Sequence, residues 1–215
     1  MIICESLCKS YRVGHGSKHV LENVNLTFGH GDRVGLLGRN GAGKTTLIKM
    51  IGGVIMPTSG RVVREMSCSW PLGFTGGFQG SLTGYDNARF IARVYNRDYK
   101  DLRAFVEDFT ELGTQLRAPV KTYSAGMRAR LAFGLSLAIE FDCYLIDEVI
   151  MVGDRNFQAK CHAEIFEKRH DRALLLATHG VDYIREYCNM AVLMRNGQAE
   201  VYHDIEEALS IYEAL

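Results

Sequence analysis

A glycine-rich stretch at residues 38–45 carries the most specific chemical signal in the chain. It reads Gly38, Arg39, Asn40, Gly41, Ala42, Gly43, Lys44 and Thr45, followed by Thr46. Glycines let successive backbone N–H groups face one anion. In this spacing a lysine reaches the β- and γ-phosphates of a nucleotide, and a threonine hydroxyl binds Mg²⁺. We therefore expect a phosphate-binding loop; the alternative is a glycine-rich turn that matches the pattern by chance.

The segments on either side of this loop favour phosphate binding. Residues 33–37 are apolar, as in a buried strand, and residues 46–51 have helical character. The order strand, glycine loop and helix is the context in which the pattern has a mechanism, because the helix N-terminus adds a partial positive charge.

Two adjacent acids follow a second apolar segment, residues 141–146. Neighbouring side chains of a strand point to opposite faces, so Asp147 and Glu148 should have different partners. We expect Asp147 to hold the Mg²⁺ of the bound nucleotide, directly or through water, and Glu148 to act as the base that polarises the attacking water. The alternative is two solvated acids at the end of a strand.

Three further positions have both a functional and a structural interpretation. Tyr11, expected between two opening strands, could stack on a purine base or pack against its neighbours. Ser124 precedes an apolar helix and is either a plain N-cap or part of a second anion site. His179 follows the strand predicted at residues 174–178 and could hydrogen-bond a γ-phosphate or be a bystander.

The composition fits one α/β domain. The chain has 215 residues, 47% of them apolar, and its 25 basic and 25 acidic side chains give no overall field that would attract nucleic acid or anionic lipid. Apolar runs such as residues 173–177 fall far short of the roughly 20 residues of a membrane span. The N-terminus does not resemble a secretory signal, and six scattered cysteines are interpreted as reduced thiols, so we expect a cytoplasmic protein.

The remaining segments indicate how the chain is organised around these residues. Residues 1–37 resemble an antiparallel opening, and Asn196-Gly197 predicts a hairpin turn. Residues 86–112 carry two apolar stripes typical of a helical insertion, whose outer face either meets a partner or leaves the helices simply packed on each other. Gln79 lies in a glycine-dense segment suited to a loop that changes conformation.

Taken in order, these motifs resemble the nucleotide-binding subunit of ATP-binding cassette (ABC) transporters, over essentially the whole chain. The matches are Gly38–Thr45 to the Walker A motif, Tyr11 to the base-stacking aromatic, Ser124–Met127 to the signature motif, Tyr144–Asp147 to Walker B, Glu148 to the catalytic glutamate, Asp154 to the D-loop aspartate and His179 to the switch histidine. The signature departs from Leu-Ser-Gly-Gly-Gln at Tyr123, Ala125 and Met127 but keeps Ser124 and Gly126. Gln79 would be the Q-loop glutamine that helps to bind Mg²⁺, although it stands closer to Leu82 than is usual.

The resemblance implies a single ABC ATPase domain over residues 1–215, with a P-loop NTPase (RecA-like) core, an antiparallel β subdomain and a helical subdomain. The core would take in residues 1–80 and 138–215, and the helical subdomain residues 81–137. It also implies a head-to-tail homodimer that holds each ATP, with its Mg²⁺, between the glycine loop of one copy and Ser124 and Gly126 of the other. Asp154 would contribute to the same composite site.

Three segments, residues 77–84, 123–128 and 147–154, are similar to the branch of this family that exports polysaccharides, in particular to capsular polysaccharide exporters of Gram-negative bacteria. That similarity implies a peripheral subunit on the cytoplasmic face of the inner membrane. It would bind multi-spanning permease subunits and, through them, envelope-spanning export proteins, but no nucleic acid. One alternative is a soluble ABC ATPase of DNA repair or translation, which usually carries two cassettes, a coiled coil or basic surfaces. The other is a small-molecule kinase, which would not need Ser124 and Asp154.

Overall fold

The computed structural model describes residues 1–14, 16–77, 79–148, 153–178 and 180–215, which form two compact units. The first, here called the core unit, comprises Met1–Pro71, Phe141–Glu148 and Asp171–Leu215. The second, here called the helical unit, comprises Leu72–Glu140 and the described residues 153–170. Together they give the mixed α/β architecture that the sequence predicts.

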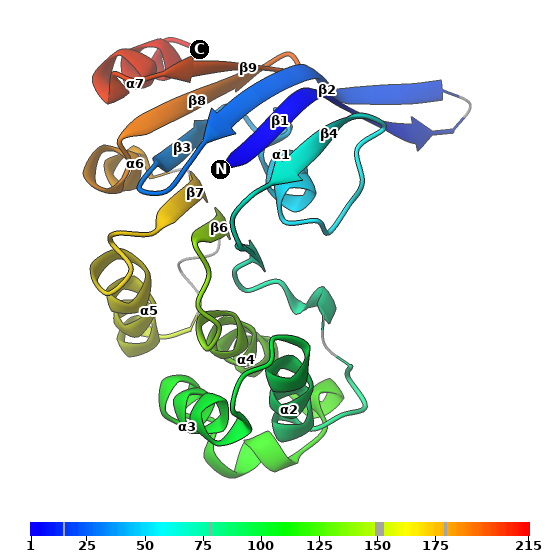
Figure 1. Ribbon diagram of the computed structural model, residues 1–215, viewed down its shortest axis with the longest axis vertical. Helices are drawn as coiled ribbons and strands as arrows, with labels where there is room; N and C mark the ends of the chain where they lie inside the picture. Colours follow the sequence, from blue (N-terminus) through cyan, green and yellow to red (C-terminus); the bar gives the residue numbers. More distant parts are fainter. Residues whose placement is uncertain (15, 78, 149–152, 179) are drawn as a thin grey trace. The chain divides into compact units, whose positions relative to one another are not determined.

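A six-stranded sheet forms the centre of the core unit, in the order β5-β6-β7-β3-β8-β9 (Figure 1). All pairings are parallel except that of β8 with β9, which is the predicted Asn196-Gly197 hairpin. The strands are β3 (Arg33–Leu37), β5 (Cys68–Pro71), β6 (Cys143–Asp147), β7 (Ala173–Ala177), β8 (Met190–Arg195) and β9 (Gln198–Tyr202). The carboxyl ends of parallel strands meet at one edge, so β3 delivers the glycine loop to the edge where β6 delivers Asp147.

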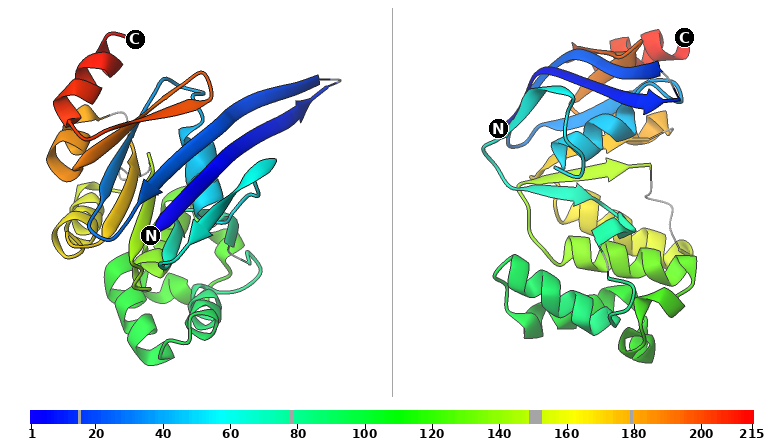
Figure 2. Two further views of the ribbon diagram at one scale, coloured as in Figure 1. Left: turned by 45° about the horizontal axis from the view of Figure 1, so that its top comes forward. Right: turned by 90° about the vertical axis from the view of Figure 1, so that its right-hand side faces the viewer.

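A three-stranded antiparallel sheet, in the order β2-β1-β4, completes the strands of the core unit. These strands are β1 (Ile2–Val13), β2 (Gly16–Phe28) and β4 (Ser59–Arg64). Pairing between β1 and β4 stops at Cys8 and Ser59, and β1 and β2 continue as a two-stranded arm (Figure 2). Tyr11 lies inside this arm, opposite Lys18, so the expectation that it falls between two strands is wrong. The opening strands are longer than their apolar alternation predicts because backbone pairing continues where both faces are exposed.

Three helices, α1 (Lys44–Ile51), α6 (Val181–Tyr187) and α7 (Ile205–Glu213), belong to the core unit. One buried cluster joins α1 to both sheets, with Leu47 and Ile48 packed among side chains of β1, β2, β3 and β6. A second cluster packs α6 and α7, through Ile184 and Leu209, against β3 and β8. Burying α1 on both sides fixes the helix that leaves the glycine loop.

The helical unit is built around α4, whose residues from Leu131 to Leu137 are all buried. Its elements are η1 (Thr75–Gly77), α2 (Gly84–Val94), α3 (Tyr99–Thr110), η2 (Gly113–Arg117), η3 (Val120–Thr122), α4 (Ala125–Leu137), α5 (Arg155–His162) and the π-helical turn η4 (Ala163–Glu167). Of the two apolar stripes predicted between residues 86 and 112, the one on α3 is buried through Leu102, Val106 and Phe109. The prediction for α2 is wrong in part, because Ile91 is buried whereas Phe90 and Val94 are exposed. Phe157 of α5 packs edge-on against Phe109 and Phe133, which joins α5 to α3 and α4.

Candidate nucleotide-binding site

The glycine loop takes a conformation that side chains would obstruct. Gly43 has φ 103° and immediately precedes α1, and a Cβ atom there would lie 2.7 Å from Leu21 Cδ2. Among the residues that the structure describes, no side chain caps the first turn of α1. The start of the helix therefore presents its N–H groups and partial positive charge to a ligand, which is the arrangement that binds phosphate.

Lys44 is buried beside the loop, with 6% of its surface exposed. Its Nζ donates to the carbonyl oxygen of Gly38 at 2.5 Å and to that of Arg39 at 3.5 Å. A buried ammonium group needs acceptors because removing it from water is costly. The loop carbonyls thus hold the Lys44 ammonium group beside the loop. There, the phosphate oxygens of a nucleotide would accept hydrogen bonds from it, in place of the carbonyls or in addition to them.

Thr45 and Asp147 meet across the core unit, one from α1 and the other from the end of β6. The Thr45 hydroxyl donates to Asp147 Oδ1 at 2.9 Å. Burial raises the pKa of Asp147 above its usual range, and the Thr45 hydrogen bond and nearby lysines oppose that shift. Hydroxyl and carboxylate oxygens are ligands that Mg²⁺ prefers, so this pair fits the predicted cation.

Glu148 follows Asp147 in a left-handed backbone conformation, with φ 60°. Its N–H donates to the carbonyl oxygen of Ala177 at 2.8 Å, which continues the pairing of β6 with β7 by one residue. A non-glycine residue in this region costs about 1–3 kcal/mol, and such strain concentrates at functional sites. The side chain is exposed, as a group that acts on water must be.

Lys44, Thr45 and Glu148 line a cavity of about 550 Å³ in the core unit. It is lined by Lys18, Val20, Asn40, Gly41, Ala42, Gly43, Lys44, Thr45, Thr46 and Glu148. Its volume lies in the range of cofactor pockets, about 300–1,000 Å³. The sequence interpretation missed Lys18 and Val20, because they belong to β2, which approaches Gly43 of the loop only in the folded chain. Tyr11, the predicted base-stacking residue, is 41% exposed and lies beside Lys9, whose Nζ is 5.2 Å from the ring centroid.

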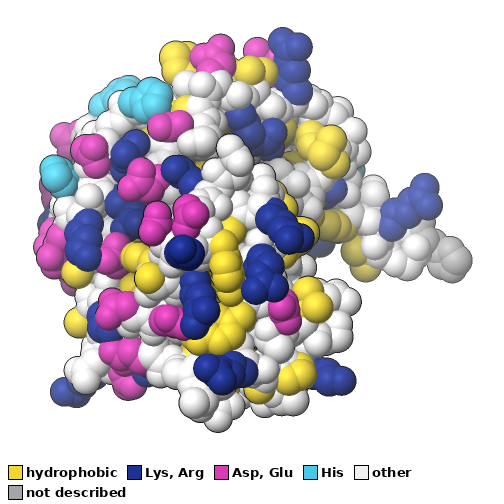
Figure 3. All heavy atoms as spheres, turned by 60° about the horizontal axis from the view of Figure 1, so that its bottom comes forward, with side chains coloured by type: hydrophobic (Ala, Val, Ile, Leu, Met, Phe, Trp, Pro, Cys, Tyr) yellow, Lys and Arg dark blue, Asp and Glu magenta, His cyan; other side chains and the backbone are white. Residues whose placement is uncertain are grey.

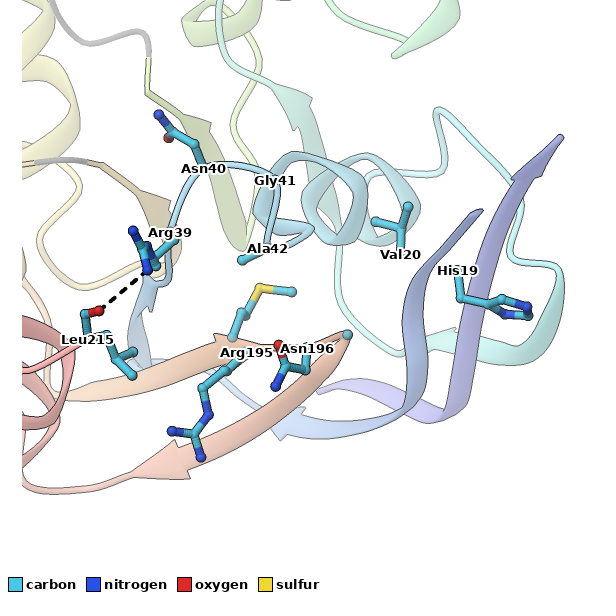
Figure 4. A pocket seen from close by; sticks show the side chains of 11 residues that line it. His19, Val20, Arg39, Asn40, Gly41, Ala42, Arg195, Asn196 and Leu215 are labelled. Carbon is cyan, nitrogen blue, oxygen red and sulfur yellow. Dashed lines mark hydrogen bonds between the residues drawn. The ribbon is translucent and has the colours of Figure 1, made fainter. Parts of the chain in front are cut away.

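Arg39 lines a second cavity, of about 380 Å³, on which the glycine loop and the β8–β9 turn converge. Its Nη1 donates to the carbonyl oxygen of Leu215 at 3.4 Å, and the side chain points toward that residue (Figure 4). Asn40, Gly41 and Ala42 line both cavities, whereas Arg39 lines this one. The predicted nucleotide contact of Arg39 would therefore come from its backbone.

In the helical unit, the start of α4 is open to solvent. Ser124, Ala125 and Gly126 are all exposed, and the Ser124 hydroxyl accepts the N–H of Met127 at 3.2 Å. Ser124 is thus the N-cap of α4, as both interpretations of this residue require. The exposure of Gly126 leaves the first turn accessible to an anion from another molecule, and that role stays a prediction.

Asp154 is the N-cap of α5. Its Oδ1 accepts the N–H of Phe157 at 3.0 Å, and Arg130 Nη2 donates to its Oδ2 at 2.6 Å. These two contacts hold the pKa of Asp154 below its usual range. The sequence interpretation missed Arg130; it stands six residues after Ser124, and no local signal names its partner.

The remaining predicted site residues are His179 and Gln79. His179 lies outside the described residues. Gln79 belongs to the helical unit and is exposed; its N–H donates to Oδ1 of the buried Asn87 at 3.1 Å. Asn87, which the sequence interpretation also missed, donates to the carbonyl oxygen of Thr83 and so ties the segment around Gln79 to α2. The metal-binding role of Gln79 remains a prediction.

Comparison with known proteins decides the family. The family model described as ABC transporter matches residues 21–151. The chain belongs to the ABC transporter family. It is 52% identical to the ATP-binding protein BexA of Haemophilus influenzae, over 99% of this chain and 98% of that protein. It is 51% identical to the capsule polysaccharide export ATP-binding protein CtrD of Neisseria meningitidis over the full length of both, and 48% identical to the polysialic acid transport ATP-binding protein KpsT of Escherichia coli over 99% of both.

Solved structures show the same ABC cassette fold. The dimeric post-hydrolysis state of the ATP-binding cassette MJ0796, bound to ADP and Pi, aligns with a TM-score of 0.76, 19% identity and coverage of 93% of this chain and 97% of that chain. An ATP-binding subunit of an ABC transporter also aligns with a TM-score of 0.76, at 21% identity. The predicted P-loop NTPase fold class is thereby confirmed. In this ABC ATPase, nucleotide binding in the cavity beside Lys44 stays a prediction.

Proposed function

We propose that this chain is the ATP-hydrolysing subunit of a transporter that exports capsular polysaccharide across the bacterial inner membrane. The observation that carries the proposal is full-length similarity, at about half of all positions, to BexA, CtrD and KpsT, two of which are named for capsule polysaccharide export or polysialic acid transport. A soluble ABC ATPase or a small-molecule kinase has no such support.

The phosphates of ATP would be held by the loop from Gly38 to Gly43, by Lys44 and by the start of α1. The uncapped helix start and the buried ammonium support this assignment. Thr45 and Asp147 would hold Mg²⁺, with Gln79 as a further candidate ligand; the cation supplies charge neutralisation at the phosphates. Tyr11 would stack on the adenine base.

Glu148 would act as the general base in hydrolysis. It lines the same cavity as Lys44 and Thr45, and its side chain is exposed to water. A carboxylate there can accept a proton from the attacking water as the oxygen bonds to the γ-phosphorus. His179 is the predicted partner that positions this water.

Two copies of the chain would bind head to tail, with each ATP between the loop of one copy and Ser124, Gly126 and Asp154 of the other. The exposed helix start at Ser124 and the dimeric state of a solved relative support this assembly. Because the γ-phosphate of ATP would contact both surfaces, hydrolysis followed by release of phosphate would remove those contacts and open the dimer. Opening and closing of the dimer would move the membrane subunits.

The partners would be multi-spanning permease subunits on the cytoplasmic face of the inner membrane and, through them, envelope-spanning export proteins. In the described part of the chain, every helix is too short or too polar to span a bilayer. The helical unit offers a surface for a partner, since Phe90 and Val94 of α2 are 54% and 57% exposed. On the face of the molecule that Figure 3 shows, apolar side chains lie among basic and acidic ones.

The experiment that tests this function is replacement of Lys44 by Ala in the capsulated bacterium that carries the chain. We expect polysaccharide to accumulate inside the cell and to disappear from its surface, and we expect the wild-type protein to copurify from membranes with a multi-spanning partner. Unchanged surface polysaccharide, or a protein without a membrane partner, would argue for a different ABC ATPase.

A further inference from the structure

The contacts of Arg130 join the two elements of the helical unit that are predicted to reach the nucleotide of a second copy. Arg130 lies on α4, which begins at the Ser124 cap, and pairs with Asp154, which caps α5. Both helices belong to the same compact unit. We propose that Arg130 is a positioning residue that fixes Asp154 relative to Ser124, so that the two reach the partner's nucleotide as one preformed surface. This inference rests on the proposed head-to-tail function.

The surroundings of Arg130 hold its guanidinium group in one orientation. The side chain is 18% exposed, although its partner Asp154 is 64% exposed. The guanidinium carbon lies 4.8 Å from the ring centroid of Phe157, over the first turn of α5. Nη1 donates to the carbonyl oxygen of Thr110 at 3.3 Å and to Glu111 Oε2 at 3.4 Å, at the end of α3.

These contacts connect three helices at one point. Nη2 is directed to Asp154 while Nη1 is directed to the end of α3, so the planar fork of arginine fills both roles at once. Lys160 of α5 pairs with the other oxygen of Glu111, at 2.5 Å. Glu111, at the end of α3, therefore contacts both α4, through Arg130, and α5, through Lys160. Rotation of Asp154 away from its cap position would break the pair with Arg130.

A second arginine supports the far end of the same pair of helices. Arg169 follows η4 and donates to the carbonyl oxygen of Leu137, the last residue of α4, at 2.9 Å. It also pairs with the buried Glu164 of η4. The segment from Asp154 to Arg169 is therefore tied to α4 near both ends, with Arg130 at the end that faces the proposed partner.

The helical unit contains a matched control. Arg103 of α3 makes the same two kinds of contact as Arg130: Nε donates to Glu107 Oε1 at 2.9 Å, and the guanidinium carbon lies 4.7 Å from the ring centroid of Tyr85. Neither partner of Arg103 belongs to α4 or α5. Arg103→Met and Arg130→Met thus each remove a pair with a carboxylate and a contact with an aromatic ring, but only Arg130→Met removes the contact with Asp154 and the hydrogen bonds to Thr110 and Glu111.

The first measurement is hydrogen exchange of the Phe157 amide in the nucleotide-free protein, because that N–H is the one that Asp154 caps. We expect exchange to be at least about tenfold faster in Arg130→Met and unchanged in Arg103→Met. Arg130→Lys keeps the charge but not the fork, so its exchange rate should lie between those of wild type and Arg130→Met. Equal exchange in the two methionine variants would overturn the inference.

The second measurement is ATP-dependent dimerisation by analytical ultracentrifugation, with Glu148→Gln as the background. We expect Arg130→Met to weaken dimerisation by about tenfold or more while ATP binds the monomer as before, and Arg103→Met to dimerise normally. Normal dimerisation of Arg130→Met despite faster exchange would overturn the inference. A Glu148→Gln protein that never dimerises would instead refute the head-to-tail function, and the exchange result would still decide whether Arg130 positions Asp154.

Discussion

Replacing Gly43 by Ala tests whether the loop depends on the space that glycine leaves. The added Cβ would lie 2.7 Å from Leu21 Cδ2 and 3.2 Å from the carbonyl oxygen of Val20, at a backbone φ of 103°. The backbone strain costs about 1–2 kcal/mol, and the crowding adds about 1–3 kcal/mol. Alanine also lowers the conformational entropy of the unfolded chain, which offsets about 0.4–1 kcal/mol of this destabilisation. We expect the free energy of unfolding to fall by about 3 kcal/mol.

Gly41→Ala is the matched control, because Gly41 lies in the same loop with φ 84° and an added Cβ would have no other described residue, apart from its two chain neighbours, within 4 Å. Only the strain and the unfolded-state effect apply there, so the expected loss is about 1 kcal/mol. Urea unfolding without nucleotide measures both variants on one scale, since a substitution in the loop leaves the surface exposed on unfolding nearly unchanged. Equal losses for the two variants would refute the assignment of the Gly43 effect to crowding against β2.

Two further predictions concern the acids after β6. Glu148→Gln should leave ATP binding intact, lower hydrolysis at least about a hundredfold and trap a closed dimer on gel filtration with ATP; normal turnover would refute the base assignment. Burial raises the pKa of Asp147, so its ionised form destabilises the fold and protonation relieves that cost. Asp147→Asn should therefore unfold at higher urea than wild type at pH 7 without nucleotide. That advantage should vanish as the pH falls through the raised pKa toward 3.8, and a constant advantage would contradict it.

Much of the core unit could be predicted because its signals are local. The glycine loop fixes its own turn and the start of α1, and the segments before and after it are the predicted strand, β3, and the predicted helix, α1. Asn196 and Gly197 both have positive φ, as a two-residue hairpin turn requires. The pairing of Thr45 with Asp147 follows once two parallel strands end at the same edge.

The features that escaped prediction depend on contacts between distant segments. Tyr11 is paired inside a long arm because β2 continues beside it, and an exposed strand has no apolar alternation to reveal its length. Arg130 and Asp154 are 24 residues apart and meet only when α5 packs on α4. Asn87 differs, because its partner Gln79 is only eight residues away; its sequence neighbours predict a helix, but no local pattern predicts that this polar side chain is buried.

The composite site between two copies is the central claim, and mixing two inactive variants tests it most directly. Lys44→Ala removes the loop cation, and Ser124→Ala removes the hydroxyl at the start of α4, so each variant alone should be inactive. In a mixed dimer, one site combines the intact loop of the Ser124 variant with the intact helix start of the Lys44 variant. An equal mixture should therefore regain about a quarter of the wild-type ATPase activity. A mixture that stays as inactive as its components, at every protein concentration, would contradict the composite site.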